Sequence, residues 1–134
     1  MFKLFSLQEA NEMIPQVDSL VTDMQAAIQD TARLRDEISQ LNGSSVEARN
    51  KAQEIGFLLR SVHETKAEID RMGVFLTDIE EGVIDFPSQV GAEVVCLSWE
   101  KGQDAITHYH RLSEDDRVPL TPEAQLESHL PLSV

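Results

Sequence analysis

The sequence predicts an α+β fold in which a long antiparallel helical hairpin is followed by a small antiparallel β-meander. Three observations predict this fold. Apolar residues recur with a heptad period over about residues 6–72, a short polar turn interrupts that pattern, and after Gly73 the pattern changes to near alternation. A heptad period is typical of packed helices, whereas alternation is typical of half-buried strands.

The first helix is expected to begin near Leu7, because Ser6 and Glu9 match the capping-box pattern that satisfies free amides at a helix start. Pro15 lies inside the pattern, so we expect the helix either to kink near residues 11–14 or to begin afresh at Pro15. Two apolar rows follow the heptad, with Thr31 as the one polar gap. These rows contain Ala10, Val17, Met24 and Ile38, and Met13, Leu20, Ala27, Leu34 and Leu41.

A hairpin connection is expected at residues 42–45, which read Asn-Gly-Ser-Ser and combine turn-forming residues with hydroxyl caps. The second helix should then run from about Val46 to Met72. Gly73 follows its last periodic residue and is typical of a helix C-cap. One apolar row of this helix contains Ala48, Ile55, Val62 and Ile69.

Four short strands are expected in the second half of the chain, over residues 73–112. They are predicted at residues 74–76, 83–86, 93–99 and 105–112, with turns at residues 80–82, 87–91 and 101–104. Short links between successive strands favour an antiparallel meander. The remaining residues, 113–134, form an acidic tail that contains Pro119, Pro122 and Pro131, with a short helix expected to start at Pro122.

Composition places the chain among single-domain proteins. Its 134 residues are 41% apolar, which suffices for one modest core, so we expect one domain over residues 1–134. Cys96 has no second cysteine to pair with, and the start MFKLFSLQEA lacks the pattern of a secretory signal. Charges interrupt every apolar stretch before it reaches the roughly 20 residues of a membrane span. We therefore expect a cytoplasmic protein with no membrane association.

The strongly acidic charge argues against nucleic acid as a partner. The net charge is −13, and residues 73–134 contribute −9 of it, with 3 Lys and Arg against 12 Asp and Glu. Such a surface repels phosphate backbones and cannot supply the counterion release that drives most nucleic-acid binding. Solubility is the simplest interpretation of the charge, and docking to a basic protein partner is the alternative.

The apolar stripe of the first helix is wider than one partner helix can cover, because Ile14, Val21 and Ile28 flank its two heptad rows. Leaving them exposed would forfeit about 25 cal/mol for each Å². We therefore predict that a second copy of the chain covers these three residues in a homodimer. The competing interpretation is that the meander folds back over the stripe within one chain.

His108 and His110 form the most suggestive chemical pattern. A spacing of two along a strand puts both imidazoles on one face, where they could form half of a site for a divalent metal. Cys96 or Glu100 on the neighbouring strand, and Asp85, are candidates for further ligands. Whether they face the histidines depends on the strand register, which the sequence leaves open. The simpler interpretation is surface or hydrogen-bonded histidines.

Other single residues have structural interpretations beside the functional ones. Trp99 is expected to anchor the sheet against the hairpin, with a stacking platform for a ligand as the alternative. Arg117 lies among acidic residues and is expected to form an ion pair, although it could instead capture an anion. Asp85 is expected to cap a strand edge or a turn, and Cys96 to be a small buried apolar residue rather than a nucleophile.

Several segments together resemble the prokaryotic domain-of-unknown-function family 2203. They are residues 5–11 (FSLQEAN) with Ile14 and Pro15, residues 82–87 (GVIDFP), and residues 97–99 (LSW) with Gly102, His110 and Arg117. The resemblance extends to about Leu120. It implies a polar set of Asp85, Trp99, His110 and Arg117, favours His110 over His108, and implies no activity. Where the family often has a cysteine and a glutamate, this chain has Ser98 and Gln103, which argues against an enzyme.

Two functional hypotheses follow from the sequence. The first is a self-associating helical-hairpin interaction module without enzymatic activity, whose hairpin supplies the surface for the dimer or for a protein partner. The second is a small ligand- or metal-binding domain, or an enzyme, with its site on the meander around His110, Asp85 and Arg117.

Overall fold

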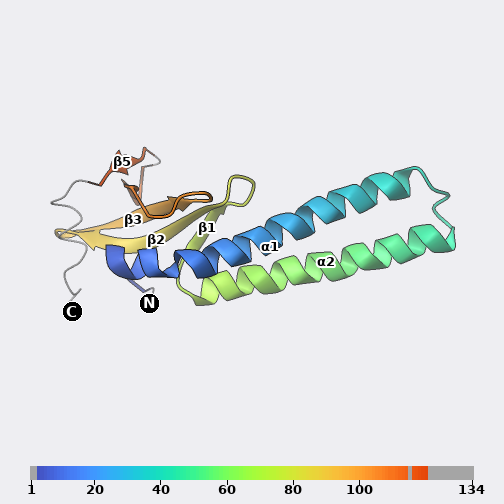
Figure 1. Cartoon of the computed structure of the whole chain (residues 1–134), viewed down its shortest axis with the longest axis horizontal. Helices are drawn as coiled ribbons and strands as arrows, with labels where there is room; N and C mark the ends of the chain where they lie inside the picture. The colour runs from blue at the N-terminus through green and yellow to red at the C-terminus, as the bar shows by residue number, and fades with distance from the viewer. Residues whose placement is uncertain (1–2, 115, 121–134) are drawn as a thin grey trace.

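The computed structural model describes residues 3–114 and 116–120. Within them, two antiparallel helices are followed by a five-stranded antiparallel sheet in which each strand pairs with the next along the chain. The elements are α1 (Leu7–Ser39), α2 (Val46–Arg71), β1 (Phe75–Asp78), β2 (Val83–Val90), β3 (Glu93–Glu100), β4 (His108–Arg111) and β5 (Val118–Pro119). The predicted fold class is confirmed. Figure 1 shows the sheet beside one end of the hairpin, with the helices extending well beyond it.

Helix α1 begins where the capping box predicts. The Glu9 amide donates to Ser6 Oγ over 3.0 Å, and the Ser6 amide donates to Glu9 Oε1 over 2.9 Å. The helix runs through Pro15 without a new start. Proline there removes the one backbone donor that would reach the Asn11 carbonyl. At about 1.5 Å per residue, the 33 residues of α1 span about 50 Å, which is why the hairpin extends beyond the sheet.

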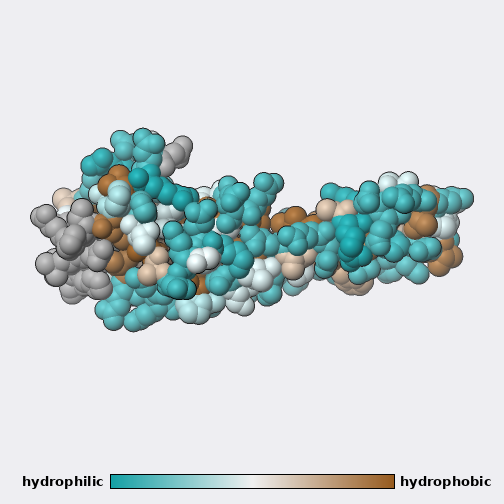
Figure 2. Space-filling view, turned by 45° about the horizontal axis from the view of Figure 1, so that its top comes forward, coloured by the Kyte–Doolittle hydropathy of each residue, from teal (hydrophilic) through white to brown (hydrophobic). Residues whose placement is uncertain are grey.

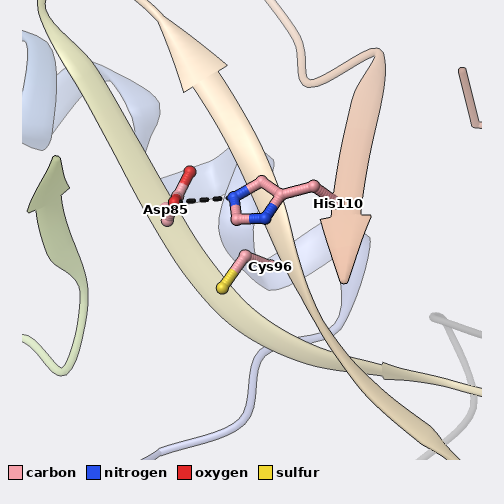
Figure 3. Close-up of side chains that lie close together, drawn as sticks. All are labelled: Asp85, Cys96 and His110. Carbon is pink, nitrogen blue, oxygen red and sulfur yellow. Dashed lines mark hydrogen bonds and ion pairs between the residues drawn. The ribbon is translucent and has the colours of Figure 1, made fainter. Parts of the chain in front are cut away.

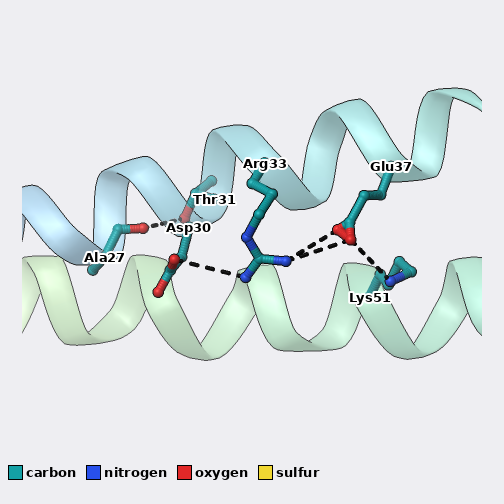
Figure 4. A network of polar contacts seen from close by, with 6 residues as sticks. All are labelled: Ala27, Asp30, Thr31, Arg33, Glu37 and Lys51. Carbon is teal, nitrogen blue, oxygen red and sulfur yellow. Dashed lines mark hydrogen bonds and ion pairs between the residues drawn. The ribbon is translucent and has the colours of Figure 1, made fainter.

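Several polar contacts lie in the half of the hairpin that is farther from the sheet (Figure 4). Lys51 on α2 forms an ion pair with Glu37 on α1 at 3.4 Å, and Arg33 contacts the same carboxylate at 3.1 Å. Thr31, the polar gap in the seam, is buried and donates its hydroxyl to the Ala27 carbonyl over 2.9 Å. The Thr31 hydroxyl is therefore satisfied within α1, and the partly exposed ion pairs add little stability.

The hydrophobic core lies between α1 and one face of the sheet, which we call the inner face. Trp99, Phe86, Ile84 and Leu97 are fully buried there against residues of α1 such as Val17. Trp99 Nε1 donates to the Gln103 carbonyl over 2.9 Å, which satisfies its polar atom. Of the two interpretations of Trp99, the anchor describes its position, and full burial in the core leaves no ring face for a ligand.

The chain's own sheet covers most of the wide stripe of α1. Ile14 and Val21 are 6% and 0% exposed and belong to the core formed with the sheet, whereas Ile28 is 39% exposed. The prediction that a second copy covers all three was therefore wrong for Ile14 and Val21, for which the competing interpretation holds. A heptad pattern shows that residues are buried without showing what buries them.

Strand β2 is longer than predicted, because it continues through Pro87 to Val90. The Pro87 carbonyl accepts a hydrogen bond from the Phe5 amide over 2.7 Å. In an antiparallel strand the carbonyl and the amide nitrogen of one residue point to the same side. The nitrogen of Pro87, which has no hydrogen to donate, therefore points toward Phe5 and away from β3, so no hydrogen bond to β3 is lost. Strand β4 is shorter than predicted and begins at His108, since the Ile106 amide donates instead to Asn11 Oδ1 on α1 over 2.8 Å.

The tail predicted from residue 113 contains β5, which pairs with β4. Residues 121–134, with the short helix expected at Pro122, lie outside the described residues. No helix in the described part of the chain combines the length and apolar character needed to cross a membrane.

The burial difference along α1 predicts opposite outcomes for one substitution at two sites a heptad apart. Val21→Glu places a charge under the sheet and should lower the free energy of unfolding by more than about 4 kcal/mol. Ile28→Glu, at the exposed site, should change it by less than about 1 kcal/mol. Urea denaturation followed by circular dichroism measures both, and similar losses for the two variants would contradict the packing.

Candidate functional site

The strand register gathers the polar candidates on the face of the sheet that points away from the core, which we call the outer face. Asp85 on β2 lies opposite Ser98 on β3, Cys96 lies opposite His110 on β4, and Ser98 lies opposite His108. Residues opposite one another in antiparallel strands point to the same face, and alternate residues along a strand do so as well. The register left open by the sequence therefore places Cys96 and both histidines together.

Three of these side chains, one from each of three adjacent strands, converge closely (Figure 3). His110 Nε2 lies 2.8 Å from Asp85 Oδ2, and one ligand atom from each of Asp85, Cys96 and His110 lies within 4.8 Å of the others. Asp85 and Cys96 are each 5% exposed, and the His110 side chain is 15% exposed. We call these three residues the Asp-Cys-His cluster.

The hydrogen bonds of His110 fix the orientation of its ring and indicate which ring nitrogens carry a proton. Its Nδ1 lies 2.9 Å from the Arg111 carbonyl, and because a carbonyl can only accept, Nδ1 carries a proton. With Nε2 facing the Asp85 carboxylate, the ring is best satisfied as an imidazolium. Burial lowers the pKa of His110, but the hydrogen bond to Arg111 and the hydrogen bond and charge of Asp85 outweigh burial and raise the pKa above the usual histidine value.

Cys96 is held as a neutral thiol. Burial, and then the negative charge of Asp85, raise the pKa of Cys96 from 9.0 to about 11. A thiolate is the nucleophilic form of cysteine, so in the metal-free protein this residue is inert at neutral pH. The expectation of a small buried residue describes Cys96 in that state.

Two polar atoms at the site are buried without a hydrogen-bond partner among residues 3–114 and 116–120. They are Asp85 Oδ1 and Ser98 Oγ. A buried polar group without a partner costs about 1–3 kcal/mol, and such atoms in a folded protein call for an explanation such as a bound ion or ligand. A bound ion, a ligand or a water molecule would each supply these two atoms with a partner.

A cavity of about 180 Å³ adjoins the Asp-Cys-His cluster. Asp85 and His110 form part of its wall, and Arg117, whose Nη1 lies 3.5 Å from Glu100 Oε2, forms another part. Its full lining is Thr77, Val83, Asp85, Ser98, His110 and Arg117. Three of the four residues of the polar set implied by the resemblance thus meet at one cavity, while Trp99 is buried on the inner face.

The candidate ligands His108 and Glu100 lie outside the Asp-Cys-His cluster. His108 points to the outer face, but its Nδ1 is 2.8 Å from Thr107 Oγ1 and it does not belong to the Asp-Cys-His cluster. Glu100 contacts Arg117 instead of the histidines. Sequence reasoning did not find Thr77 or Ser98 as lining residues. The spacing of two between Cys96 and Ser98 could have indicated Ser98 once the register was known.

The cluster is poorly arranged for general base or nucleophilic catalysis. Both ring nitrogens of His110 already contact acceptors, so neither offers a free lone pair to remove a proton. Ser98 Oγ makes no hydrogen bond to His110 in the described residues, so His110 does not activate this hydroxyl. Metal binding is different, because a metal ion would replace the proton on Nε2 and engage all three ligand atoms at once.

A comparison with known families supports the resemblance seen in the sequence. The model of the family described as "Uncharacterized conserved protein (DUF2203)" matches residues 3–119. No curated protein matches the chain. No solved structure matches it either.

The raised pKa of His110 predicts how the stability of the metal-free protein depends on pH. A group with a raised pKa in the folded state stabilises the fold below its unfolded pKa of about 6.5, and this contribution disappears as the pH rises through the folded-state pKa. The stability advantage of the wild type over His110→Gln should therefore shrink above about pH 6.5.

Urea denaturation in the presence of a chelator, repeated between about pH 5 and pH 9, measures this difference. His108→Gln keeps the pair of His110 with Asp85 and should retain the wild-type pH dependence. A constant gap between the wild type and His110→Gln over this range would contradict the ion pair.

Proposed function

Because the chain belongs to the family described as "Uncharacterized conserved protein (DUF2203)", a description that names no activity, we propose its function from its own geometry. The domain binds one divalent transition metal ion through Asp85, Cys96 and His110. The observation that carries this proposal is the convergence of the three ligand atoms within 4.8 Å in a nearly buried setting.

The ligand types support a metal of the Zn²⁺ class. A thiolate, an imidazole nitrogen and a carboxylate oxygen are the three kinds of ligand that Zn²⁺ accepts in proteins, at about 2.0–2.3 Å. In a tetrahedral site those bonds put ligand atoms about 3.5 Å apart. The widest separation among the three ligand atoms, at most 4.8 Å, would shorten by about 1 Å, and the 2.8 Å between His110 Nε2 and Asp85 Oδ2 would lengthen by less than about 1 Å.

The surroundings of His110 also favour a metal. A metal-bound histidine commonly donates its other ring N–H to a backbone carbonyl, which fixes the tautomer and aims the ligating nitrogen. His110 has this arrangement, with Nδ1 on the Arg111 carbonyl and Nε2 aimed at Asp85. A metal ion would also give the unpartnered Asp85 Oδ1 or its neighbour Oδ2 a positive partner.

Three protein ligands leave one tetrahedral position open. Structural zinc sites are usually closed by four protein ligands, whereas sites that act on water or a substrate keep one position free. The open position here would face the cavity lined by Ser98 and Arg117. A reducing compartment such as the cytoplasm suits this proposal, because Cys96 can ligate only as a free thiolate.

Metal binding requires the loss of two protons in this site. The raised pKa of Cys96, about 11, means that its thiol proton must leave, and the imidazolium of His110 must release the proton on Nε2. The metal charge supplies the driving force for both. The apparent affinity should therefore increase with pH near neutrality.

We predict that the chelator-treated protein binds Zn²⁺ at one ion per chain in isothermal titration calorimetry. His110→Ala and Cys96→Ala should each weaken binding by more than about 100-fold, since even changes outside the ligand shell cost about 10–100-fold. Titrations in buffers of different ionisation enthalpy should report released protons.

His108→Ala is the matched control, because His108 lies on the same strand and face but outside the Asp-Cys-His cluster. It should bind Zn²⁺ as the wild type does. Circular dichroism verifies that each variant is folded. An absence of stoichiometric binding, or an equal loss in His108→Ala, would refute the metal site.

A second candidate function is self-association through the part of the hairpin that extends beyond the sheet. This is the homodimer and interaction-module hypothesis, restricted to that part of the hairpin. Its support is the exposure of Ile28, Leu59 and Phe57, which are 39%, 38% and 59% exposed. Figure 2 shows a largely hydrophilic hairpin with apolar residues in separate small groups on the visible face. Exposed apolar residues that occur singly are ordinary at protein surfaces, so this candidate ranks below the metal site.

Sedimentation equilibrium tests the second candidate. A dimer through the hairpin should dissociate more readily in the Ile28→Glu, Leu59→Glu double variant than in the wild type, because charges in an apolar contact cost several kcal/mol. A wild type that sediments as a monomer at high concentration would remove this candidate without affecting the metal site.

A further inference from the structure

The cavity beside the Asp-Cys-His cluster offers hydrogen-bond donors that residues 3–114 and 116–120 leave unused. Ser98 is 4% exposed, and its hydroxyl has no partner among residues 3–114 and 116–120. Arg117 on the same wall has Glu100 as its one ion pair in that part of the chain, at a long 3.5 Å. A guanidinium has five N–H donors, and most of those of Arg117 have no hydrogen-bond partner in the described part of the chain.

One acceptor at the cavity, the Val83 carbonyl, is already engaged, and Asp85 Oδ1, which has no partner among residues 3–114 and 116–120, is an acceptor that the proposed metal ion would take up. Thr77 donates its hydroxyl to the Val83 carbonyl over 3.4 Å. The Asp85 carboxylate is the main acceptor in the wall, and it would serve the metal ion. A ligand for the remaining space must therefore bring acceptors to Ser98 and Arg117 and need few donors in return.

The local charge does not oppose an anion. With a divalent ion bound, the carboxylate of Asp85 and the thiolate of Cys96 balance the metal charge, and neutral His110 adds none. The guanidinium of Arg117 remains, shared with exposed Glu100 across 3.5 Å, where solvent weakens the pair. An anion in the cavity would thus have both a metal ion and an arginine as positive partners.

The size of the cavity restricts the ligand to a small one. Its volume of about 180 Å³ exceeds the roughly 30 Å³ share of one water molecule several times. It lies below the roughly 300 Å³ at which pockets for larger organic ligands begin. A nucleotide does not fit, whereas a carboxylate or an inorganic oxyanion does.

We propose that this cavity binds a small oxyanion, a carboxylate or a phosphate, with one oxygen at the open position of the metal ion and another on Ser98 and Arg117. The inference rests on the metal site proposed above. Arginine suits this position because its planar fork can hold two oxygens of one anion. The buried Ser98 hydroxyl would gain the acceptor that it lacks among the described residues.

The experiment uses the full chain loaded with Co²⁺, whose absorption spectrum reports changes in its ligands. Acetate and phosphate are titrated separately into the loaded protein. At least one of them should change the spectrum with saturation. Saturation by acetate alone would assign the site to carboxylates and by phosphate alone to tetrahedral anions, and either result supports the proposal.

Variants locate the anion. Arg117→Ala and Ser98→Ala should each raise the dissociation constant of the anion by about tenfold or more, the loss expected for a hydrogen bond to a charged group, while Co²⁺ affinity stays within about threefold of the wild type. Arg111→Ala is the matched control, because Arg111 also pairs with a glutamate of β3, Glu93, but lies outside the cavity lining.

The outcomes separate the two proposals. A protein that fails to bind Co²⁺ refutes the metal site itself. A protein that binds Co²⁺ but shows no spectral response to either anion overturns the oxyanion inference and leaves the metal site intact. An equal loss of anion affinity in Arg111→Ala and Arg117→Ala would also overturn it, because the effect would then reflect overall charge rather than the cavity.

Discussion

The chemistry of the outer face depends on the register between β3 and β4, which sets Cys96 opposite His110. A slip of one residue would turn His110 toward the core and remove it from Asp85. The loop between the strands holds the register, because Trp99 Nε1 donates to the Gln103 carbonyl and the Glu100 amide donates to Gln103 Oε1. The bond from the Ile106 amide to Asn11 Oδ1 ties the same segment to α1. The core side of the sheet thus fixes what the outer side presents.

The inner and outer faces of the sheet have different roles. The inner face supplies hydrophobic stabilisation, because Trp99, Phe86 and Leu97 pack there against α1. That leaves the outer face free to carry polar groups whose burial costs stability, such as Asp85 and the unpartnered Ser98 hydroxyl. A sheet with a polar outer face needs this arrangement, since a core on one side must offset what the other side costs.

Local sequence patterns allowed the helices and strands to be predicted. They could not predict contacts between segments that are distant in the sequence. The capping box at Ser6, the hairpin turn and the change of period after Gly73 all depend on neighbouring residues, and the fold class followed from them. What covers Ile14 and Val21 depends on how the sheet packs on α1, and a heptad pattern is silent on this point. Pro87 inside β2 was missed for a related reason, since its tolerance depends on the remote Phe5 amide. The meeting of Asp85, His110 and Arg117 was suggested by the family resemblance and not by spacing.

The position of the proposed metal outside the hydrophobic core has a consequence for how metal and folding are related. In a small zinc finger the metal replaces a core, so the apo chain is unfolded. Here the core on the inner face is complete without the Asp-Cys-His cluster, and in the metal-free state Asp85 satisfies the imidazolium of His110 at 2.8 Å. Binding of the proposed metal would then exchange protons for an ion within a folded framework, instead of creating that framework. The affinity of such a site would be set by competition with the protons on Cys96 and His110, and the ion would load and leave without unfolding of the chain.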